Sequence, residues 1–156
     1  MGGTQPSRSR SISNFQTTLF LIQSSSVKKQ KQTVGVMIPE EHKPSKNEIN
    51  VAWILARHYQ TGVAILKPSK QYMVKTPDFA IRNEHYELKV LTGPQVRQLL
   101  VLLDRAKKQA DHIVIDIRKT KITERRAVEV CAKFVRKHNR HRVVLITTSG
   151  VLDIKA

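Results

Sequence analysis

Three stretches of the chain carry apolar residues at helical spacing. In residues 45–59 the apolar side chains of one face are Ile49, Ala52, Trp53 and Ala56. This stretch opens with Ser45 and, three positions later, Glu48. That is the spacing of a capping box, in which each side chain bonds the other residue's backbone amide. Residues 96–109 and 123–137 have the same period. The pattern therefore predicts three amphipathic helices.

Shorter apolar runs between these helices predict strands. They cover residues 63–66, 78–81, 86–90, 113–117 and 143–146, and a short end follows at 151–154. The pair Asn83-Glu84 separates the second run from the third and predicts a hairpin turn. The expected order is helix, three strands, helix, strand, helix, strand (α-β-β-β-α-β-α-β). Such an order predicts an α/β domain with a central mixed β-sheet flanked by helices.

Composition divides the chain near residue 36. Residues 1–36 are rich in Ser, Gln and Thr, and they carry five basic residues and no acid. That composition buries too little apolar surface to offset the entropy lost on ordering, so we expect a disordered basic tail. Every periodic segment lies in residues 37–156, which form the expected folded domain.

Charge adds a partner to this picture. The 156 residues include 28 Lys and Arg against 12 Asp and Glu, a formal net charge of +16. The tail holds five of these positive charges, so +11 remains on residues 37–156. Such a field attracts nucleic acid, because each neutralised phosphate releases condensed counterions. The charge indicates a partner but no reaction, and a basic protein without a nucleic-acid role stays open.

Cysteine usage and hydropathy bear on the compartment. The chain has one cysteine, Cys131, so we expect a fold without disulfides that suits a reducing compartment. Residues 19–22, the longest apolar cluster near the start, are far shorter than the ~20 residues of a membrane-spanning helix. We expect no membrane segment, no cleavable signal peptide and a cytoplasmic site of action.

Two carboxylates and a lysine coincide in the expected hairpin. Glu87 and Lys89 project from one face of a strand, ~6.6–6.8 Å apart along it. Asp78 starts the neighbouring strand, and the short turn brings it beside Glu87. Hard oxygen ligands of this kind suit Mg²⁺ or Mn²⁺, with Zn²⁺ as a further candidate. Such a metal would polarise a phosphate oxygen and activate water, and the lysine would orient or deprotonate that water.

Glu48, in the first helix, is a fourth candidate because this helix precedes the hairpin. Each of these residues also has a purely structural explanation. Glu87 and Lys89 fit an ordinary hairpin that points them to solvent, and Glu48 fits a capping box with Ser45. The residues alone leave both explanations open.

Taken together, these motifs are similar to a known family. Glu48, Lys67-Pro68-Ser69, Thr76-Pro77-Asp78 and Glu87-Leu88-Lys89 resemble the PD-(D/E)xK nuclease superfamily. More narrowly, they resemble the tRNA-cleaving C-terminal toxin domains of CdiA proteins from contact-dependent growth inhibition. Residues 112–120 are similar to that family too, and the resemblance covers about residues 40–156. Many relatives follow the E-x-K lysine with Ser-Pro, where this chain has residues 90–94, Val-Leu-Thr-Gly-Pro.

The resemblance implies a role for each candidate. Asp78 would be the bridging metal ligand and Glu87 the second ligand. Lys89 would position the attacking water, and Glu48 would complete the metal site. The resemblance also implies a PD-(D/E)xK nuclease-like fold, a tRNA substrate and an acidic immunity protein as a partner.

Other residues have a weaker claim to function. Lys67, Ser69 and Gln95 are candidates for lining the substrate groove. His138 and His141 offer metal-free acid–base cleavage of RNA, but a basic solvated turn explains them better. Pairing with Arg118 or with a backbone amide explains Asp116. Aromatic residues are scarce at 5%, which argues against a single-strand stacking platform of the OB or RRM type.

Three functions therefore stay in view. The first is a metal-dependent endonuclease cleaving RNA, which the resemblance narrows to tRNA. The second is a DNA endonuclease of the same fold, and the third is a non-enzymatic basic nucleic-acid-binding protein. One catalytic core serves both RNA and DNA, so the fold does not separate the first two.

Overall fold

The computed structural model describes residues 34–69, 71 and 75–156. Its elements, in chain order, are β1 (Gly35–Met37), α1 (Lys46–Tyr59), β2 (Gly62–Ile65), β3 (Phe79–Ile81), β4 (Glu84–Val90), α2 (Val96–Ala106), β5 (His112–Asp116), α3 (Glu124–Lys137), β6 (Arg142–Ile146) and β7 (Val151–Ile154). The expected helices and strands are all present, close to their expected positions. The expected order was incomplete, because β1 and β7 add one strand at each end.

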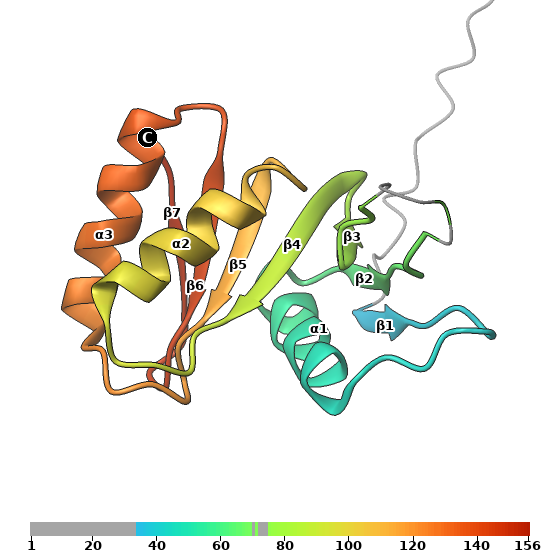
Figure 1. Cartoon of the computed structure of the whole chain (residues 1–156). Helices are drawn as coiled ribbons and strands as arrows, with labels where there is room; N and C mark the ends of the chain where they lie inside the picture. The colour runs from blue at the N-terminus through green and yellow to red at the C-terminus, as the bar shows by residue number, and fades with distance from the viewer. Residues whose placement is uncertain (1–33, 70, 72–74) are drawn as a thin grey trace, which may run out of the picture. The chain divides into compact units, whose positions relative to one another are not determined.

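The strands form one seven-stranded mixed sheet in which spatial order follows chain order, β1 to β7 (Figure 1). β1 pairs parallel with β2, and β2, β3 and β4 form an antiparallel meander. β4, β5 and β6 are parallel, and β7 returns antiparallel to β6. A parallel neighbour needs a crossover connection, and α2 and α3 supply the two crossovers of this half. The expected central mixed β-sheet flanked by helices is confirmed.

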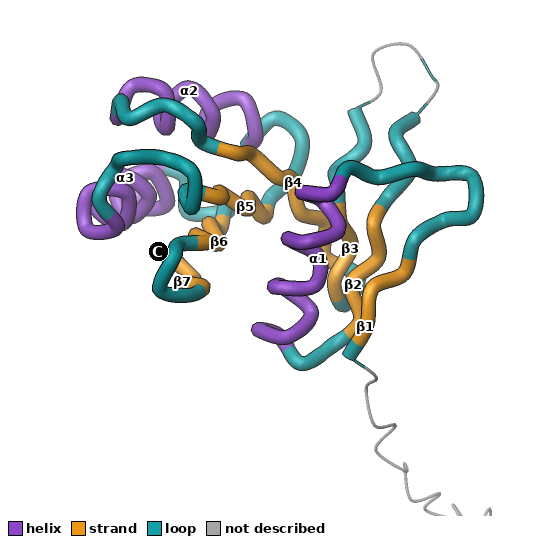
Figure 2. Tube along the Cα trace, turned by 90° about the horizontal axis from the view of Figure 1, so that it is seen from below, coloured by secondary structure: helices purple, strands orange, loops and turns teal. Residues whose placement is uncertain are grey.

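The helices lie on opposite faces of the sheet (Figure 2). α2 and α3 bury one face in a core that includes Ile113, Ile115 and Leu145. α1 packs on the other face, over a core that includes Phe79 and Leu88. Side chains alternate along a strand, so neighbouring residues of β4 face different cores. In register, Glu87 pairs with Ile113 and Lys89 pairs with Ile115, which places both on the face covered by α2 and α3.

Local signals explain where several elements begin and turn. Ser45 caps α1 in the expected capping box with Glu48. The hairpin between β3 and β4 turns at Arg82 (φ 49°) and Asn83 (φ 68°), one position before the expected Asn83-Glu84. A tight hairpin turn of this hand needs positive φ at both central residues, and asparagine accepts it readily. Arg82 is held there by a 2.8 Å bond from its Nη2 to the Tyr59 carbonyl oxygen.

The expected boundary at residue 36 also shifts. Gly35 and Val36 belong to β1 because their backbone pairs with Gly62 and Val63 of β2. Three residues are too short a run to stand out in the sequence, which is why this strand was assigned to the tail. Residues 1–33 lie outside the described residues, so the disordered basic tail stays a prediction there.

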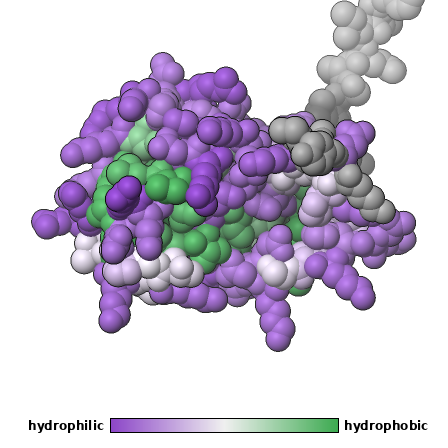
Figure 3. All heavy atoms as spheres, viewed as in Figure 1, coloured by the Kyte–Doolittle hydropathy of each residue, from purple (hydrophilic) through white to green (hydrophobic). Residues whose placement is uncertain are grey.

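The described surface is mostly hydrophilic, with exceptions on the helices. Figure 3 shows hydrophobic residues gathered over α2 on the face it displays. Among the exposed large hydrophobic residues are Leu100 and Val101 of α2 and Trp53 of α1. Among the described residues, no helix has the length and apolar character needed to cross a membrane.

Candidate functional site

The β3–β4 hairpin places Asp78 beside Glu87. Phe79 pairs with Tyr86, so Asp78 lies one position before the first paired residue of β3, opposite Glu87. Its backbone N–H donates to the Tyr86 carbonyl oxygen at 3.0 Å, and its carbonyl accepts from Leu66 N–H at 2.9 Å. The Asp78 side chain turns to β4, where Oδ2 accepts the Leu88 N–H at 2.7 Å. The expected neighbourhood of Asp78 and β4 is confirmed.

Glu87 is buried, not pointed to solvent. Its exposed fraction is 4%. Oε1 accepts from the Lys89 ammonium and, at 2.7 Å, from Gln109 Nε2. Oε2 is buried and has no hydrogen-bond partner. A carboxylate held this way costs free energy unless something satisfies the second oxygen. The ordinary-hairpin explanation is therefore wrong for Glu87.

Gln109 is a site residue that the sequence reasoning missed. It lies in the turn that follows α2, and its amide reaches across to β4. It also lines a cavity of about 440 Å³, together with Lys107, Lys108 and Arg140. A glutamine at the end of an amphipathic helix carries no chemical signal, and only the packing of α2 on the sheet brings it to Glu87.

The charges of Glu87, Lys89 and Glu48 all act on Asp78. The pKa of Asp78 is raised to about 6, mainly by burial and to a smaller extent by the negative charges of Glu87 and Glu48. The hydrogen bond from Leu88 and the positive charge of Lys89 act in the opposite direction. A carboxyl with a raised pKa in a cluster of this kind holds its negative charge at a cost near neutral pH. A cation bound there would relieve that cost.

This cost predicts a stability change in the metal-free protein. The pKa of Asp78 is 3.8 unperturbed and about 6 when folded, so the folded state binds the proton more tightly. The resulting destabilisation is absent below about pH 4, grows between pH 4 and 6, and is complete above pH 6. Asp78→Asn keeps an oxygen for the Leu88 N–H and removes the charge. In EDTA it should raise the free energy of unfolding by about 1–2 kcal/mol at pH 7.5, a value discounted for partial exposure.

Urea denaturation of both proteins at pH 7.5 and pH 4 measures this effect. The gain should fall to near zero at pH 4, where the wild-type carboxyl is already protonated. An equal gain at both pH values would show that asparagine improves packing and that the charge has no part in it.

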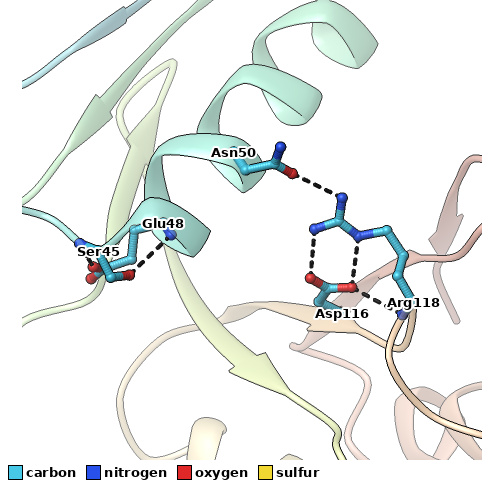
Figure 4. A network of polar contacts seen from close by, with 5 residues as sticks. All are labelled: Ser45, Glu48, Asn50, Asp116 and Arg118. Atoms are coloured by element: carbon cyan, nitrogen blue, oxygen red, sulfur yellow. Dashed lines mark hydrogen bonds and ion pairs between the residues drawn. The ribbon is translucent and has the colours of Figure 1, made fainter.

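Glu48 caps α1 and also acts by its charge on Asp78. Its Oε2 accepts the Ser45 N–H at 2.6 Å, and its own N–H donates to Ser45 Oγ at 3.2 Å (Figure 4). The capping box is therefore real. The charge of Glu48 also acts on Asp78, although it is the smallest of the causes that shift the Asp78 pKa. The structure shows the cap and leaves the metal-site role of Glu48 a prediction.

The carboxylates of Asp78 and Glu87 fit the ligand preference of a hard divalent cation. Asp78 and Glu87 are adjacent carboxylates, and Glu87 Oε2 is buried without a partner. One or two carboxylates, completed by water and substrate phosphate, are the usual protein share of a Mg²⁺ site. Across residues 34–69, 71 and 75–156, no three His, Cys, Asp or Glu side chains are gathered closely enough to hold a metal by themselves.

The three groove candidates separate in space. Lys67 directly follows Leu66, which pairs with Asp78, and its ammonium contacts Glu41. Ser69 accepts the Gln71 N–H, and its own N–H donates to Thr76 Oγ1. Gln95 lies elsewhere, at the start of α2, where it lines a cavity of about 310 Å³ with Arg97 and Arg105. Lys67 and Ser69 follow the end of β2, next to the start of β3 where Asp78 lies, and Gln95 does not. A substrate role remains a prediction for all three.

Asp116 and the histidine pair have structural surroundings. The Asp116 carboxylate is fully buried and accepts two side-chain bonds and one backbone bond from Arg118, as expected. Arg118 Nη1 also donates to Asn50 Oδ1 at 2.8 Å, which ties β5 to α1 (Figure 4). His138 and His141 lie near the end of α3 beside Phe134. The expected solvent exposure of this turn was wrong for His141, which is 7% exposed and lies beside the Phe134 ring.

A family comparison bears on this geometry. Residues 75–151 match the sequence model of the contact-dependent growth inhibition CdiA C-terminal domain. Over these residues the chain is similar to the CdiA C-terminal domain family. The match contains Asp78, Glu87, Lys89 and Gln109, and Glu48 lies before it. CdiA C-terminal domains are toxins of contact-dependent growth inhibition, generally of the nuclease type.

A structural comparison agrees on the fold. A solved structure described as the CdiA-CT/CdiI toxin and immunity complex from Burkholderia pseudomallei is similar with a TM-score of 0.56 and 14% sequence identity. The likeness covers 78% of this chain and 99% of that chain. At this identity it shows the CdiA C-terminal fold alone. No curated protein matches the sequence.

Proposed function

We propose that this domain is a metal-dependent endonuclease that cleaves RNA, with tRNA as its substrate. The observation that carries the proposal is the group formed by Asp78, Glu87 and Lys89. A carboxyl with a raised pKa lies beside a buried carboxylate that has one unsatisfied oxygen, and a lysine contacts that carboxylate. Similarity to a family whose toxins are generally nucleases supports it.

Asp78 and Glu87 are the residues that would hold the metal. Pro77-Asp78 and Glu87-x-Lys89 follow the PD-(D/E)xK pattern. Two carboxylates favour Mg²⁺ or Mn²⁺, whereas Zn²⁺ typically binds to sites rich in nitrogen and sulfur ligands. When bound, such an ion stabilises charge on the phosphate and supplies an activated water. Relief of the repulsion around Asp78 and a partner for Glu87 Oε2 favour its binding.

Lys89 has the surroundings that a water-positioning group needs. Its ammonium contacts Glu87, and its side chain is 22% exposed, so part of it is accessible to solvent and substrate. The contact with Glu87 fixes the lysine's orientation, and Gln109 donates to the same Glu87 oxygen, Oε1. We assign Lys89 the role of orienting or deprotonating the attacking water, and Gln109 the role of positioning Glu87.

Charge and family narrow the substrate and partner. A net charge of +16 favours any nucleic acid, and the resemblance to tRNA-cleaving CdiA toxins favours structured RNA in the cytoplasm. The Burkholderia pseudomallei relative is described as a complex of toxin and immunity protein. By analogy we propose that this basic domain also has an immunity protein, and that the immunity protein is acidic because charge complementarity favours binding.

A cleavage assay tests the proposed substrate. The full-length chain is incubated in Mg²⁺ with total RNA and, separately, with supercoiled plasmid. We expect tRNA-sized RNA to be cut and the plasmid to remain supercoiled. Cleavage of the plasmid while the RNA stays intact would identify the domain as a DNA endonuclease. Binding of both without cleavage would identify it as a non-enzymatic nucleic-acid-binding protein.

Glu48→Gln separates the two roles of Glu48. Glutamine also serves as the third helical residue of a capping box, so the melting temperature should hardly change. The charge is lost, and we expect RNA cleavage at saturating Mg²⁺ to fall by at least about a hundredfold, a barrier increase of roughly 2.7 kcal/mol. Ser45→Ala is the matched control, since it weakens the cap by about 1 kcal/mol and keeps the carboxylate. Unchanged turnover in Glu48→Gln would leave Glu48 a cap alone.

A further inference from the structure

The outer face of α1 carries a groove that the proposed site does not use. It has a volume of about 380 Å³, and α1 lines it with Lys46, Asn50, Trp53 and Arg57. These residues follow one another at intervals of four, three and four positions, so they form one stripe along the helix. Arg118, from the loop after β5, closes one side through its bond to Asn50.

Trp53 is the unusual member of this stripe. It is 40% exposed, whereas a large aromatic side chain is normally buried to a greater extent. Ile49 and Ile54 are partly buried in the sheet core and add apolar surface to the groove lining. An indole on such a surface presents a flat apolar face, which is the shape that a nucleobase covers when it stacks.

The charges around Trp53 identify the kind of occupant. Lys46 and Arg57 are cationic, the charge of Arg118 is already paired with Asp116, and none of the described residues that line the groove is acidic. An apolar peptide or a second copy of this +16 chain would gain nothing from the charges of Lys46 and Arg57. A base flanked by phosphates fits both features at once, because the base covers the indole and the phosphates meet the cations.

We propose that this groove binds an unpaired nucleotide of the RNA substrate, with its base stacked on Trp53 and its flanking phosphates near Lys46 and Arg57. The choice of RNA rests on the proposed function. Bases within a duplex are already stacked on each other, so the groove recognises a loop or a single-stranded end. A single stacking residue of this kind differs from the multi-aromatic platform that the composition excludes. Because α1 also carries Glu48, the groove and the candidate site share one helix.

Trp53 is the chain's only tryptophan, so its fluorescence reports directly on the groove. The full-length chain is titrated in EDTA, which keeps the RNA intact, with an RNA hairpin that has an unpaired loop. The loop should quench the Trp53 emission. A blunt RNA duplex of equal length and base-free heparin should bind through charge and leave the emission nearly unchanged.

Variants test the same contact through affinity. Trp53→Ala should weaken binding of the hairpin by at least about tenfold, and Trp53→Phe should recover most of the loss. Leu100→Ala, which removes an exposed apolar side chain from α2, is the matched control and should leave affinity unchanged. Trp53→Ala should bind heparin as well as the wild type does.

Three outcomes would overturn the proposal: equal quenching by hairpin and duplex, equal quenching by heparin, or wild-type affinity of Trp53→Ala for the hairpin. Tighter binding of a deoxyribose hairpin of the same sequence would assign the groove to DNA. The quenching is measured on the wild-type chain, so this test remains valid even if a variant fails to fold. It also needs no cleavage, so loop-specific quenching in a protein that never cuts RNA would sink the proposed function alone.

Discussion

Replacement of Lys89 by methionine is expected to lower RNA cleavage by about a hundred- to ten-thousandfold, the usual contribution of a positioned proton-transfer group. Lys89 contacts the buried Glu87 carboxylate, next to Asp78, and no other lysine or arginine is bonded to Glu87 among the described residues. Methionine keeps the unbranched apolar stem and removes the ammonium. A single-turnover assay on labelled RNA measures the loss directly.

RNA binding should survive the same change. The domain has many other cations, so loss of one phosphate contact should alter the slope of affinity against salt by only about one unit. Lys133→Ala removes an exposed lysine from α3 and serves as the matched control, with cleavage near the wild-type rate. Near wild-type cleavage by Lys89→Met would remove Lys89 from the catalytic group.

Arg118→Ala is expected to lower the free energy of unfolding by about 3 kcal/mol. The Asp116 carboxylate is fully buried, and Arg118 supplies both of its side-chain hydrogen bonds. Loss of the guanidinium leaves a buried charge with only the Arg118 backbone N–H as a partner. Breaking a buried pair costs about 3–5 kcal/mol, and the lower end applies because Arg118 is 25% exposed.

Urea denaturation measures this loss against two controls. Arg126→Ala breaks an exposed ion pair with Glu129 and should change stability by less than about 1 kcal/mol. Asp116→Asn combined with Arg118→Met removes both charges and should recover much of the loss. Equal stability of Arg118→Ala and the wild type would show that the buried Asp116 carboxylate does not depend on the Arg118 guanidinium.

Local patterns predicted most of the fold. Helical spacing located α1, α2 and α3, and the Ser45–Glu48 pair located the start of α1, because both signals lie within one or two turns of the chain. The strands missed as sheet members, β1 and β7, are short and owe their place to pairing with β2 and β6. Pairing between distant segments leaves no periodic trace in the sequence.

The site was predictable to the extent that it is local. Asp78 and Glu87 are joined by one hairpin, so strand alternation and turn length sufficed to bring them together. The burial of Glu87 was not predictable, because it depends on α2 packing over β4 and on Gln109 reaching back from the following turn. Gln95 lines a cavity with Val90 and Arg97, and its place in a substrate groove stays a prediction.

The most direct measurement is cleavage of one labelled tRNA by the full-length chain, first in EDTA and then after excess Mg²⁺ is added to the same reaction. Wild-type protein should be inactive in EDTA and cut after Mg²⁺ is added, because Asp78 and Glu87 have no evident part in metal-free cleavage. Glu87→Gln, which keeps the size of the side chain, should remain inactive in both. Full wild-type cleavage in EDTA, or unimpaired cleavage by Glu87→Gln, would contradict a metal centre at Asp78 and Glu87.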